Sequence, residues 1–425
     1  MKVPKPSTCV APFSCNSRKE AIGRRVYGTD TWLARRFLQT IGDPPLLVTL
    51  WDDTKIAPPG STPAVGMIIR DRGALLRLLS NPQLHFGDDY CTGRIEIEGG
   101  LAQFMETVYR AMGQTPRFRR TSEPAAYRRH QPHLNSLEGS RQNIHHHYDI
   151  GNDFYRLWLD DEMLYTCAYF PDPNASLEAA QIAKMDLVCR KLCLRPGQTV
   201  VEAGCGWGAL ARHMARHYGA IVKAYNISHE QIAYSRERAK LEGLEGRVEY
   251  VEDDYRAIAG TYDAFVSVGM LEHVGPDHYQ ELGGVIERSL TEQGLGLIHT
   301  IGQNVAAPLS PWFLKRIFPG SYPPTLREMM ALFEPFEFTI LDVENLRLHY
   351  AKTCENWLDR FEQNRDQIRE MFDERFIRAW RLYLSGCVAN FSIGELQLFQ
   401  VVFSRPGNNR IHLTRSHMIA DTGVP

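Results

Sequence analysis

The sequence predicts an α/β protein: a doubly wound parallel sheet preceded by a smaller α+β domain. Strands and amphipathic helices alternate from about residue 176 to 301. A β-branched strand at 199–203 leads into a glycine-rich turn. Residues 44–112 instead carry short apolar runs separated by Gly and Pro. Alternation at this spacing is typical of parallel βαβ units, whereas the interrupted runs are typical of a small mixed domain.

Hydrophobic periodicity places the elements of the larger region in order. Ser176 is a typical N-cap residue, and it precedes a helix whose apolar face is predicted to carry Leu177, Ile182, Met185, Val188 and Leu192. Strands are expected at 199–203, 221–226, 247–251, 262–268 and 295–301, with the apolar runs 337–343 and 396–403 completing the sheet. The helices between them are expected at 208–218, 228–242 and near 277–290.

The N-terminal region is predicted to hold a helix at 73–80 and two basic segments. Segment 18–36 mixes arginines, among them Arg24, Arg25, Arg35 and Arg36, with apolar residues, the pattern of a basic amphipathic surface helix. Segment 117–130 is basic and interrupted by Pro, which is typical of a linker. We therefore place one domain at 1–125, a linker to about 140, and a second domain at 141–425.

Composition excludes several classes of protein. The 425 residues include 48 Lys and Arg against 50 Asp and Glu, a net charge of −2, so no overall attraction to nucleic acid is expected. The chain shows no apolar run long enough to span a bilayer and no secretory leader at its start. The nine cysteines include no C-x-x-C pair. These features predict a cytoplasmic protein with reduced thiols.

The strongest motif is the turn from Glu202 through Gly204 and Gly206 to Gly208. Glycines let a ligand approach the backbone, and the following helix N-terminus favours a negative group such as a carboxylate. Ala209 also completes a G-x-G-x-x-[G/A] pattern, so a dinucleotide remains an alternative at this point.

Two details favour S-adenosylmethionine (SAM) over a dinucleotide. The E-x-G-x-G-x-G turn resembles the SAM-binding turn of class I methyltransferases, which have a Rossmann-like doubly wound sheet. The next strand ends in Asn226 and Ile227, without the acidic residue that binds an NAD ribose. Class I enzymes often have an acid there as well, so its absence also weakens an ordinary methyltransferase interpretation. Asp253 and Asp254 end the third strand, where those enzymes place an acid near adenine.

Several segments in order resemble the cyclopropane-fatty-acyl-phospholipid synthases and the mycolic acid cyclopropane synthases. The matching segments are 147–155, 165–170, 202–208, 227–231, 267–275, 298–302 and 317–320. They extend over roughly residues 140–405, and chance does not readily produce so many motifs in order. Segments 86–90 and 99–101 resemble the long members that act on phospholipid, whereas the mycolate-acting members lack this N-terminal domain.

The resemblance implies methylene transfer from SAM to the cis double bond of an unsaturated acyl chain. The alkene takes the methyl group, and the carbocation then loses a proton to a bound bicarbonate and closes to a cyclopropane. The implied bicarbonate site comprises the side chains of Glu272, His299 and Tyr350 with the backbone of Cys167 and Ile301. The implied SAM site comprises Tyr165, Thr166, Glu202, Gly204, Gly206, Gly208, Asn226, Ile227, Gln231, Asp253 and Asp254.

Further expectations concern the lipid and metal. Tyr148, Tyr165, Tyr169 and Phe170 are aromatic candidates for the acyl and sulfonium site, and Trp312, Phe313, Phe318 and Tyr322 for the lipid tunnel. No metal is expected, because the consecutive histidines 145–147 do not share a face. The partner implied is phospholipid with unsaturated chains at the inner face of the membrane, bound peripherally through the basic segments, and the long members imply a homodimer.

Two alternatives remain open at the level of sequence. The same domain could add a methyl or methylene branch to an oleoyl chain or methylate an amine, because the direction of proton loss is not encoded in a motif. A protein of this fold could instead bind lipid without catalysis. The complete set of Glu202, Gly204, Gly206, Glu272 and His299 argues against the non-catalytic alternative.

Overall fold

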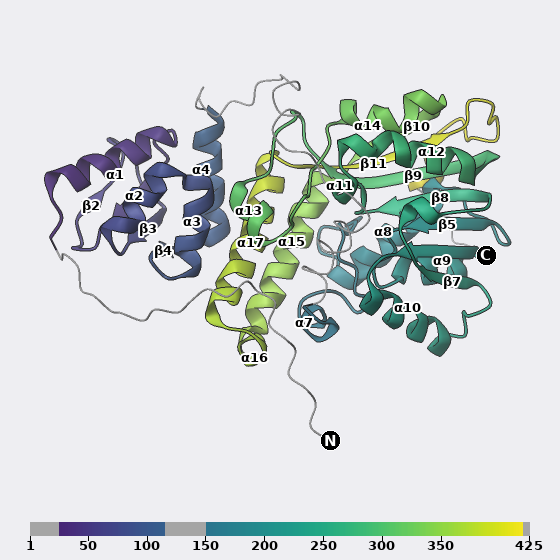
Figure 1. Ribbon diagram of the computed structural model, residues 1–425, viewed down its shortest axis with the longest axis horizontal. Helices are drawn as coiled ribbons and strands as arrows, with labels where there is room; N and C mark the ends of the chain where they lie inside the picture. Colours follow the sequence, from purple (N-terminus) through teal and green to yellow (C-terminus); the bar gives the residue numbers. More distant parts are fainter. Residues whose placement is uncertain (1–24, 115–149, 420–425) are drawn as a thin grey trace.

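The computed structural model describes residues 25–114 and 150–419, which form two sheets with helices packed between them. The smaller sheet belongs to the N-terminal region, drawn in purple in Figure 1. The larger sheet lies at the opposite end of the molecule, and helices α13, α15 and α17 stand between the two. The predicted linker 117–130 and the histidine run 145–147 lie outside the described residues.

The N-terminal region is the α+β domain that its apolar runs predict. Its strands are β1 (Leu46–Thr49), β2 (Lys55–Ile56), β3 (Val65–Ile69) and β4 (Ile95–Glu98), in the order β2-β1-β3-β4. Its helices are α1 (Gly28–Thr40), α2 (Arg72–Ser80), α3 (Pro82–Cys91) and α4 (Leu101–Gln114). The Asp71 carboxylate accepts from the Ala74 amide at 3.0 Å and thereby begins α2 close to its predicted start.

Helix α1 differs from the predicted amphipathic helix in its bounds. Within the described part of segment 18–36, the helix begins at Gly28, and it continues to Thr40. Phe37 and Leu38 are buried, whereas Arg35 and Arg36 are exposed. Trp32 is exposed on the same helix, with the Arg36 guanidinium 5.9 Å from its ring centre. The described part therefore has an apolar face on the domain core and a basic, aromatic face in solvent.

The larger sheet has seven strands at nearly the predicted positions. They are β5 (Thr199–Ala203), β6 (Ile221–Asn226), β7 (Val248–Glu252), β8 (Tyr262–Val268), β9 (Leu290–Gly302), β10 (Thr339–Asn345) and β11 (Gln397–Ser404). Their order is β10-β11-β9-β8-β5-β6-β7. The expectation of a wholly parallel sheet is wrong at one strand, because β11 runs antiparallel to both β9 and β10. Its first residue, Gln397, pairs with Gly302 at the end of β9, so β11 enters the sheet from the edge where β9 leaves it.

Helices cover both faces of this sheet and extend beyond its ligand-binding edge. They are α7 (Asn152–Arg156), α8 (Leu177–Lys191), α9 (Ala209–His217), α10 (His229–Leu241), α11 (Leu271–Val274), α12 (Tyr279–Ser289), α13 (Pro311–Arg316), α14 (Leu326–Phe333), α15 (Arg347–Gln363), α16 (Arg365–Met371), α17 (Glu374–Ile393) and α18 (Ser416–Ile419). The hydroxyl of Ser176 accepts from the Ala179 amide, which confirms the predicted N-cap of α8.

The predicted apolar face of α8 is wrong at Ile182, which is 48% exposed. The helix buries Lys184 and Lys191 instead. Hydrophobic periodicity assigns a charged side chain to solvent unless a tertiary partner is known. Each buried lysine has such a partner, on Thr166 and Gln400 respectively.

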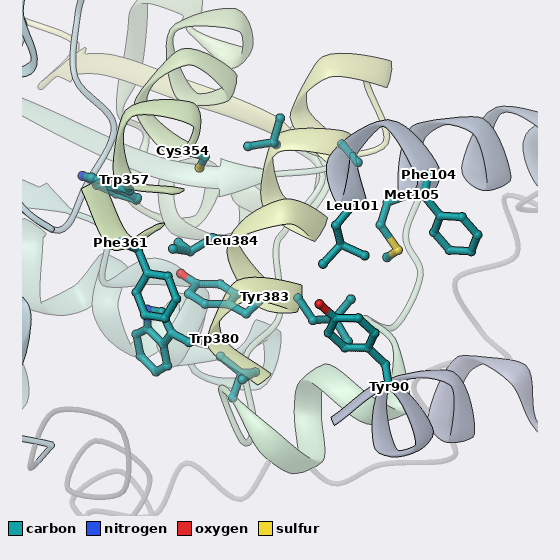
Figure 2. Packing of buried hydrophobic residues seen from close by; sticks show 14 of the residues in the cluster. Tyr90, Leu101, Phe104, Met105, Cys354, Trp357, Phe361, Trp380, Tyr383 and Leu384 are labelled. Atoms are coloured by element: carbon teal, nitrogen blue, oxygen red, sulfur yellow. The ribbon is translucent and has the colours of Figure 1, made fainter. Parts of the chain in front are cut away.

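The two domains share one hydrophobic core. Figure 2 shows Trp357 of α15 and Trp380 and Tyr383 of α17 facing the same interior as Met105 of α4 and Tyr90 of α3. Arg378 of α17 crosses the boundary and donates to the Tyr90 carbonyl at 2.6 Å. Helices α15 and α17 therefore form the common wall between the sheets.

This core predicts the effect of truncating Phe361, which is fully buried on α15 with its ring 6.4 Å from that of Phe154. Phe361→Ala should lower the free energy of unfolding by about 3–5 kcal/mol, because it leaves a cavity the size of a ring. Leu348→Ala, at a position 64% exposed on the same helix, is the matched control and should change it by less than about 0.5 kcal/mol. Urea denaturation, monitored by tryptophan fluorescence, measures the free energy of unfolding of both variants. Equal decreases in the two variants would contradict the packing described.

Candidate active site

The glycine turn after β5 leaves an open space above one of its residues. Gly204, Gly206 and Gly208 have φ angles of 83°, 54° and 77°, which disfavour any side chain. A Cβ at Gly206 would have no heavy atom within 4 Å, whereas one at Gly208 would lie 2.6 Å from the Tyr250 hydroxyl. Gly206 therefore gives a ligand access to the backbone, and Gly208 is required by packing within the protein.

A cavity of about 160 Å³ lies at this turn, at the carboxyl ends of β5, β6 and β8. Parallel sheets bind ligands at this edge. Ten of the predicted SAM-site residues line it: Tyr165, Thr166, Glu202, Gly204, Gly206, Asn226, Ile227, Gln231, Asp253 and Asp254. Gly208, the eleventh, is absent from the lining and has the packing role described above.

Opposite charges meet at one end of this cavity. Burial raises the pKa of Glu202 to about 7, although the positive charges of Lys184 and Arg212 lower it. The Oε2 atom of Glu202 is buried without a hydrogen-bond partner among the described residues. Lys184 donates to the Thr166 hydroxyl at 3.0 Å, and burial lowers its pKa to about 8. A carboxylate and an ammonium facing one cavity suit a zwitterion such as the amino-acid end of a cofactor.

Of the polar side chains at the strand ends, some are hydrogen-bonded within the protein and one has acceptor capacity for a ligand. The Asn226 amide donates to Gln231 Oε1 at 2.7 Å, and its oxygen accepts from the Ile227 amide at 2.8 Å. Asp254 is paired with Arg256 at 3.2 Å. Within the described residues, the Asp253 carboxylate accepts only from the Asp254 amide, at 2.8 Å. Asp253 is therefore the acid best placed to receive a ligand hydroxyl or amine.

A second cavity, of about 350 Å³, adjoins the first. The two share Tyr165, Thr166, Gly269 and His273 in their linings. From this junction the second cavity extends into the N-terminal domain, where its lining is largely apolar. That part is formed by Phe37, Ile41, Leu46, Met67, Leu78 and Phe104. A long apolar ligand in the second cavity would meet a polar ligand in the first at the junction.

The aromatic residues predicted around this lipid site separate into two groups. Trp312, Phe313 and Phe318 line the second cavity, as expected of a tunnel. Tyr322 is fully buried and donates to Glu328 at 2.8 Å, so it packs outside the cavity. Tyr169 and Phe170 lie against the His349 ring, with centre distances of 4.8 and 6.4 Å, and are absent from both linings. Tyr148 lies outside the described residues.

Tyr165 stands inside a cage of aromatic rings at the junction. Its ring centre lies 5.1 Å from Trp158, 5.3 Å from Trp357 and 5.6 Å from Tyr155. Its hydroxyl is 2.7 Å from that of Tyr383. Tyr155 and Trp158 line neither cavity, but Tyr165 and Trp357 line the second one. Aromatic faces attract cations in a site that excludes water, so these two rings suit a ligand that carries or develops positive charge.

In the described part of the chain, Glu272 of α11 is one of two acidic residues, with Glu395, that line the second cavity. Its Oε1 accepts from the Ile301 amide at 2.5 Å, and its Oε2 has no partner among the described residues. Burial raises its pKa to about 7 against the opposing effect of that backbone bond. The sequence-based expectation placed the Ile301 backbone on a ligand, but its amide hydrogen is bonded to Glu272. Near neutral pH the Glu272 carboxyl is therefore divided between its acidic and ionised forms.

Of the other residues predicted for this group, Tyr350 lines the same cavity as Glu272, whereas His299 lines neither cavity. His299 of β9 is buried, with Nδ1 on the Gln400 amide at 3.0 Å and Nε2 without a partner among the described residues. Tyr350 of α15 lines the second cavity and stacks on Phe391. Burial raises its pKa well above the usual value, with smaller contributions from Cys167 and Glu272.

Cys167 is not a nucleophile in this geometry. It is completely buried, and its thiol donates to the Ala168 carbonyl at 3.1 Å. Burial raises its pKa far above the usual value, so the reactive thiolate does not form. Cys167 lines neither cavity, and a role for its backbone stays a prediction. All seven cysteines in the described ranges are free, as expected of reduced thiols.

Comparison with known proteins identifies the family. The family model described as mycolic acid cyclopropane synthetase matches residues 135–401, and a domain of unknown function (DUF7884) matches residues 33–117. The chain belongs to the cyclopropane synthetase family. It is a SAM-dependent methyltransferase with the class I fold predicted from its glycine turn.

Relatives of known description match most of this methyltransferase. The chain is 37% identical to the cyclopropane-fatty-acyl-phospholipid synthase of Escherichia coli, over 85% of this chain and 93% of that one. It is 33% identical to a probable fatty acid methyltransferase of Pseudomonas putida, over 88% and 96%. The solved structure of the mycolic acid cyclopropane synthase CmaA1 with SAH and CTAB is similar with a TM-score of 0.60 and 29% identity, over 62% of this chain and 98% of that one.

Sequence reasoning about this methyltransferase missed two residues of its cavities. Lys184 was overlooked because a lysine on an amphipathic helix is normally solvated; its place among the apolar positions of α8 was the available signal. His273 lines both cavities at their junction, and burial lowers its pKa to about 4, so its imidazole is neutral. Its position beside Glu272 was the signal.

Among the described residues, no helix is both long and apolar enough to cross a bilayer.

The raised pKa of Glu272 predicts a pH-dependent gain in stability for Glu272→Gln. The folded methyltransferase keeps the proton up to about pH 7, whereas the unfolded chain releases it near its ordinary pKa of 4.5. The native protein therefore loses stability between these pH values. The amide removes this cost, so at pH 8 the variant should be more stable by about 3 kcal/mol, and below pH 4.5 by almost nothing.

Urea denaturation at the two pH values measures this difference. Glu230→Gln, at an exposed position in the first turn of α10, is the matched control and should show no such pH dependence. A Glu272→Gln variant less stable than the wild type at pH 8 would show that the buried carboxylate is stabilised by its surroundings.

Proposed function

We propose that this methyltransferase transfers a methylene group from SAM to the cis double bond of unsaturated acyl chains in membrane phospholipid, forming cyclopropane fatty acids. The observation that carries the proposal is the junction of the two cavities at Tyr165, Thr166, Gly269 and His273. One cavity is polar and lies at a glycine turn, whereas the other is largely apolar and extends into a second domain. A methyl donor and an alkene would meet where they join.

The residues of the first cavity fit SAM. The Glu202 carboxylate suits the α-ammonium group, and the Lys184 ammonium suits the α-carboxylate. Gly206 provides the close approach to the backbone, and Asp253 has acceptor capacity for the nucleoside end. SAM supplies a methyl group on a positively charged sulfur. These residues would hold that group toward the junction with the second cavity.

The second cavity fits an acyl chain. An alkene is a poor nucleophile, so most of the rate must come from orientation and exclusion of water. Side chains of the N-terminal domain would bury the distal part of the chain, and Phe313 and Phe318 the part near the junction. Tyr165 and Trp357 line this cavity and present aromatic faces where the alkene would become cationic.

The residues around Glu272 fit a bicarbonate ion. Oε2 of Glu272 and Nε2 of His299 are buried polar atoms without partners in the described ranges. Glu272 and Tyr350 line the second cavity, as does Ile301, two residues beyond His299 on β9. With a pKa of about 7, part of Glu272 is protonated near neutral pH, and this form would donate a hydrogen bond to the anion while keeping its proton. Bicarbonate would supply the base for the carbocation proton. The Ile301 amide would act through Glu272, and the Cys167 backbone completes the proposed set.

The domain arrangement proposed for this function is a lipid-binding domain at 1–125, a linker to about 140 and a catalytic domain at 141–425. The protein would work in the cytoplasm, bound peripherally to the inner face of the membrane, and as a homodimer. The exposed basic face of α1, with Trp32 beside Arg35 and Arg36, supports membrane docking. About 1 kcal/mol per Arg is the usual gain near an anionic leaflet.

Branching of the acyl chain is the second candidate function. The similarity to the probable fatty acid methyltransferase of P. putida favours it. The two candidates share every step up to the carbocation and differ only in the proton that is removed. A lipid-binding protein without catalysis is the third candidate.

The deciding assay incubates the full-length protein with SAM and vesicles of monounsaturated phosphatidylethanolamine and phosphatidylglycerol. The acyl products are then analysed by mass spectrometry. Cyclopropanation adds one CH2 and leaves a chain that does not take up hydrogen under mild reduction. The same gain on a chain that still takes up hydrogen would indicate methylene branching, and branched-chain fragments would indicate methyl transfer. No product with any vesicle would leave the non-catalytic candidate.

Glu272→Ala should abolish product formation in this assay and leave the dissociation constant of SAM within about tenfold of the wild-type value. The reason is that Glu272 lines the second cavity but not the first. Isothermal calorimetry and the lipid assay measure the two effects. Turnover close to that of the wild type would remove Glu272 from the mechanism.

Docking is tested with the double variant Arg35→Glu and Arg36→Glu. At low salt its affinity for vesicles containing phosphatidylglycerol should fall by at least about thirtyfold, from the loss of about 1 kcal/mol per arginine. The matched control reverses two exposed charges of the catalytic domain, Arg195→Glu and Lys240→Glu, and should retain most of the affinity. Vesicle sedimentation measures the affinity of both double variants. If both lost affinity equally, the attraction to vesicles would depend on net charge alone and not on the basic face of α1.

A further inference from the structure

Gln400 and His299 form a buried pair across two strands. They are directly opposite each other in the antiparallel pairing of β11 with β9. Side chains at opposed positions lie on the same face of a sheet. Both residues are at most 1% exposed, and Gln400 Nε2 lies 3.0 Å from His299 Nδ1. The hydrogen bond between them is therefore sealed from solvent.

Lys191 determines which way the Gln400 amide points. It lies at the end of α8 with its side chain buried, and its Nζ is 2.7 Å from Gln400 Oε1. An ammonium group has three donors and no acceptor, so it requires the amide oxygen on its side. Glu344, at 2.5 Å, and Asp342, at 3.7 Å, hold the ammonium in this place. The amide nitrogen must then face His299.

This orientation determines the protonation of His299. The Gln400 amide nitrogen donates, so Nδ1 must accept and the imidazole carries its single proton on Nε2. A proton on Nδ1 would bring two donors face to face. Rotating the amide to relieve that contact would place its NH2 group against the Lys191 ammonium. Burial, together with the positive charges of Lys184 and Lys191, also holds the pKa of His299 well below its usual value.

The remaining nitrogen is a donor without an acceptor. Nε2 of His299 is buried and has no hydrogen-bond partner among the described residues. Leaving a buried donor unsatisfied is costly, so such groups commonly serve a ligand. His299 lines neither cavity, but its carbonyl accepts from the amide of Gly269 at 2.8 Å, and Gly269 lines both cavities. Ile301, two residues further along the same strand, lines the second cavity together with Glu272.

We propose that Lys191 and Gln400 are positioning residues that hold His299 as a neutral Nε2–H donor toward the anion of the active site. His299 then binds the anion and does not act as the base. The catalytic consequence rests on the proposed function, whereas the tautomer itself does not. Neither Lys191 nor Gln400 lines a cavity, so both residues act through His299. We call the chain of hydrogen bonds from Lys191 through Gln400 to His299 the relay.

Histidine NMR on the full-length wild-type protein tests the tautomer directly. The protein is labelled with 15N-histidine, and the His299 signals are assigned by their absence in His299→Gln. We expect one neutral Nε2–H form from about pH 5 to pH 8, because a site that cannot accept a proton does not titrate there. An Nδ1–H tautomer, or an imidazolium near pH 6, would overturn the proposal. This result does not depend on turnover.

Substitutions at Gln400 and Lys191 test the relay. In Gln400→Glu a carboxylate accepts from both sides, so the proton should move to Nδ1 and the donor at Nε2 should be lost. Lys191→Met frees the amide to rotate, whereas Lys191→Arg should restore the wild-type tautomer because a guanidinium also only donates. Glu245→Gln is the control: this residue is exposed beyond the end of α10, away from Lys191, Gln400 and His299, and its substitution should keep both tautomer and turnover.

The kinetic readout separates the relay from the proposed function. Gln400→Glu and Lys191→Met should lower kcat for lipid by about tenfold to a hundredfold, the usual effect of losing an outer partner of a ligating histidine, with the dissociation constant of SAM unchanged. If the wild-type protein shows the Nε2–H tautomer by NMR but forms no lipid product, the proposed function is refuted and the relay still stands. If the wild-type protein is active, and the Gln400→Glu variant loses the Nε2–H tautomer but keeps the wild-type kcat, the positioning role is refuted.

Discussion

The packing of α15 against α17 is the constraint on which both cavities and the domain arrangement depend. These helices carry the aromatic core that joins the small sheet to the large one. The same helices supply Tyr350, Trp357 and Tyr383 to the lining of the apolar cavity. The wall that holds the domains together is therefore also the wall that a lipid would contact. Closely packed aromatic cores deform little, so this wall fixes the position at which the two cavities meet.

Charged groups are buried at the site at a cost to stability. Glu202 and Glu272 have pKa values raised to about 7 by burial, and Lys184 has one lowered to about 8. Each ionised form would be better solvated in water. Proteins keep such groups where ligands complete their bonding, and enzymes commonly give up stability at active sites for this reason. Buried atoms of Glu202, Glu272 and His299 have no partner among the described residues, and the proposed ligands would complete their hydrogen bonds.

The reversed strand β11 has a chemical consequence. Because it runs antiparallel to β9, it places Gln400 directly across from His299, close to the end of α8 that carries Lys191. A side chain between two strands and a helix has few ways to move, and its hydrogen bonds are therefore well defined. The sheet thus orients one face of the candidate site, and the helical wall of α15 and α17 orients the other.

The sequence by itself determined the large sheet and its glycine turn, because strand periodicity and turn chemistry are local properties. Ten of the eleven residues that the family resemblance implied for SAM line the cavity at this turn. Only the tertiary structure decided the direction of β11, the burial of Lys184 and Lys191, the solvent exposure of Ile182 and the extension of the apolar cavity into the N-terminal domain. These features depend on contacts between distant segments, such as the 209 residues that separate Lys191 from Gln400. A local pattern shows which side chains are polar; only the fold brings a polar side chain the partner that lets it be buried.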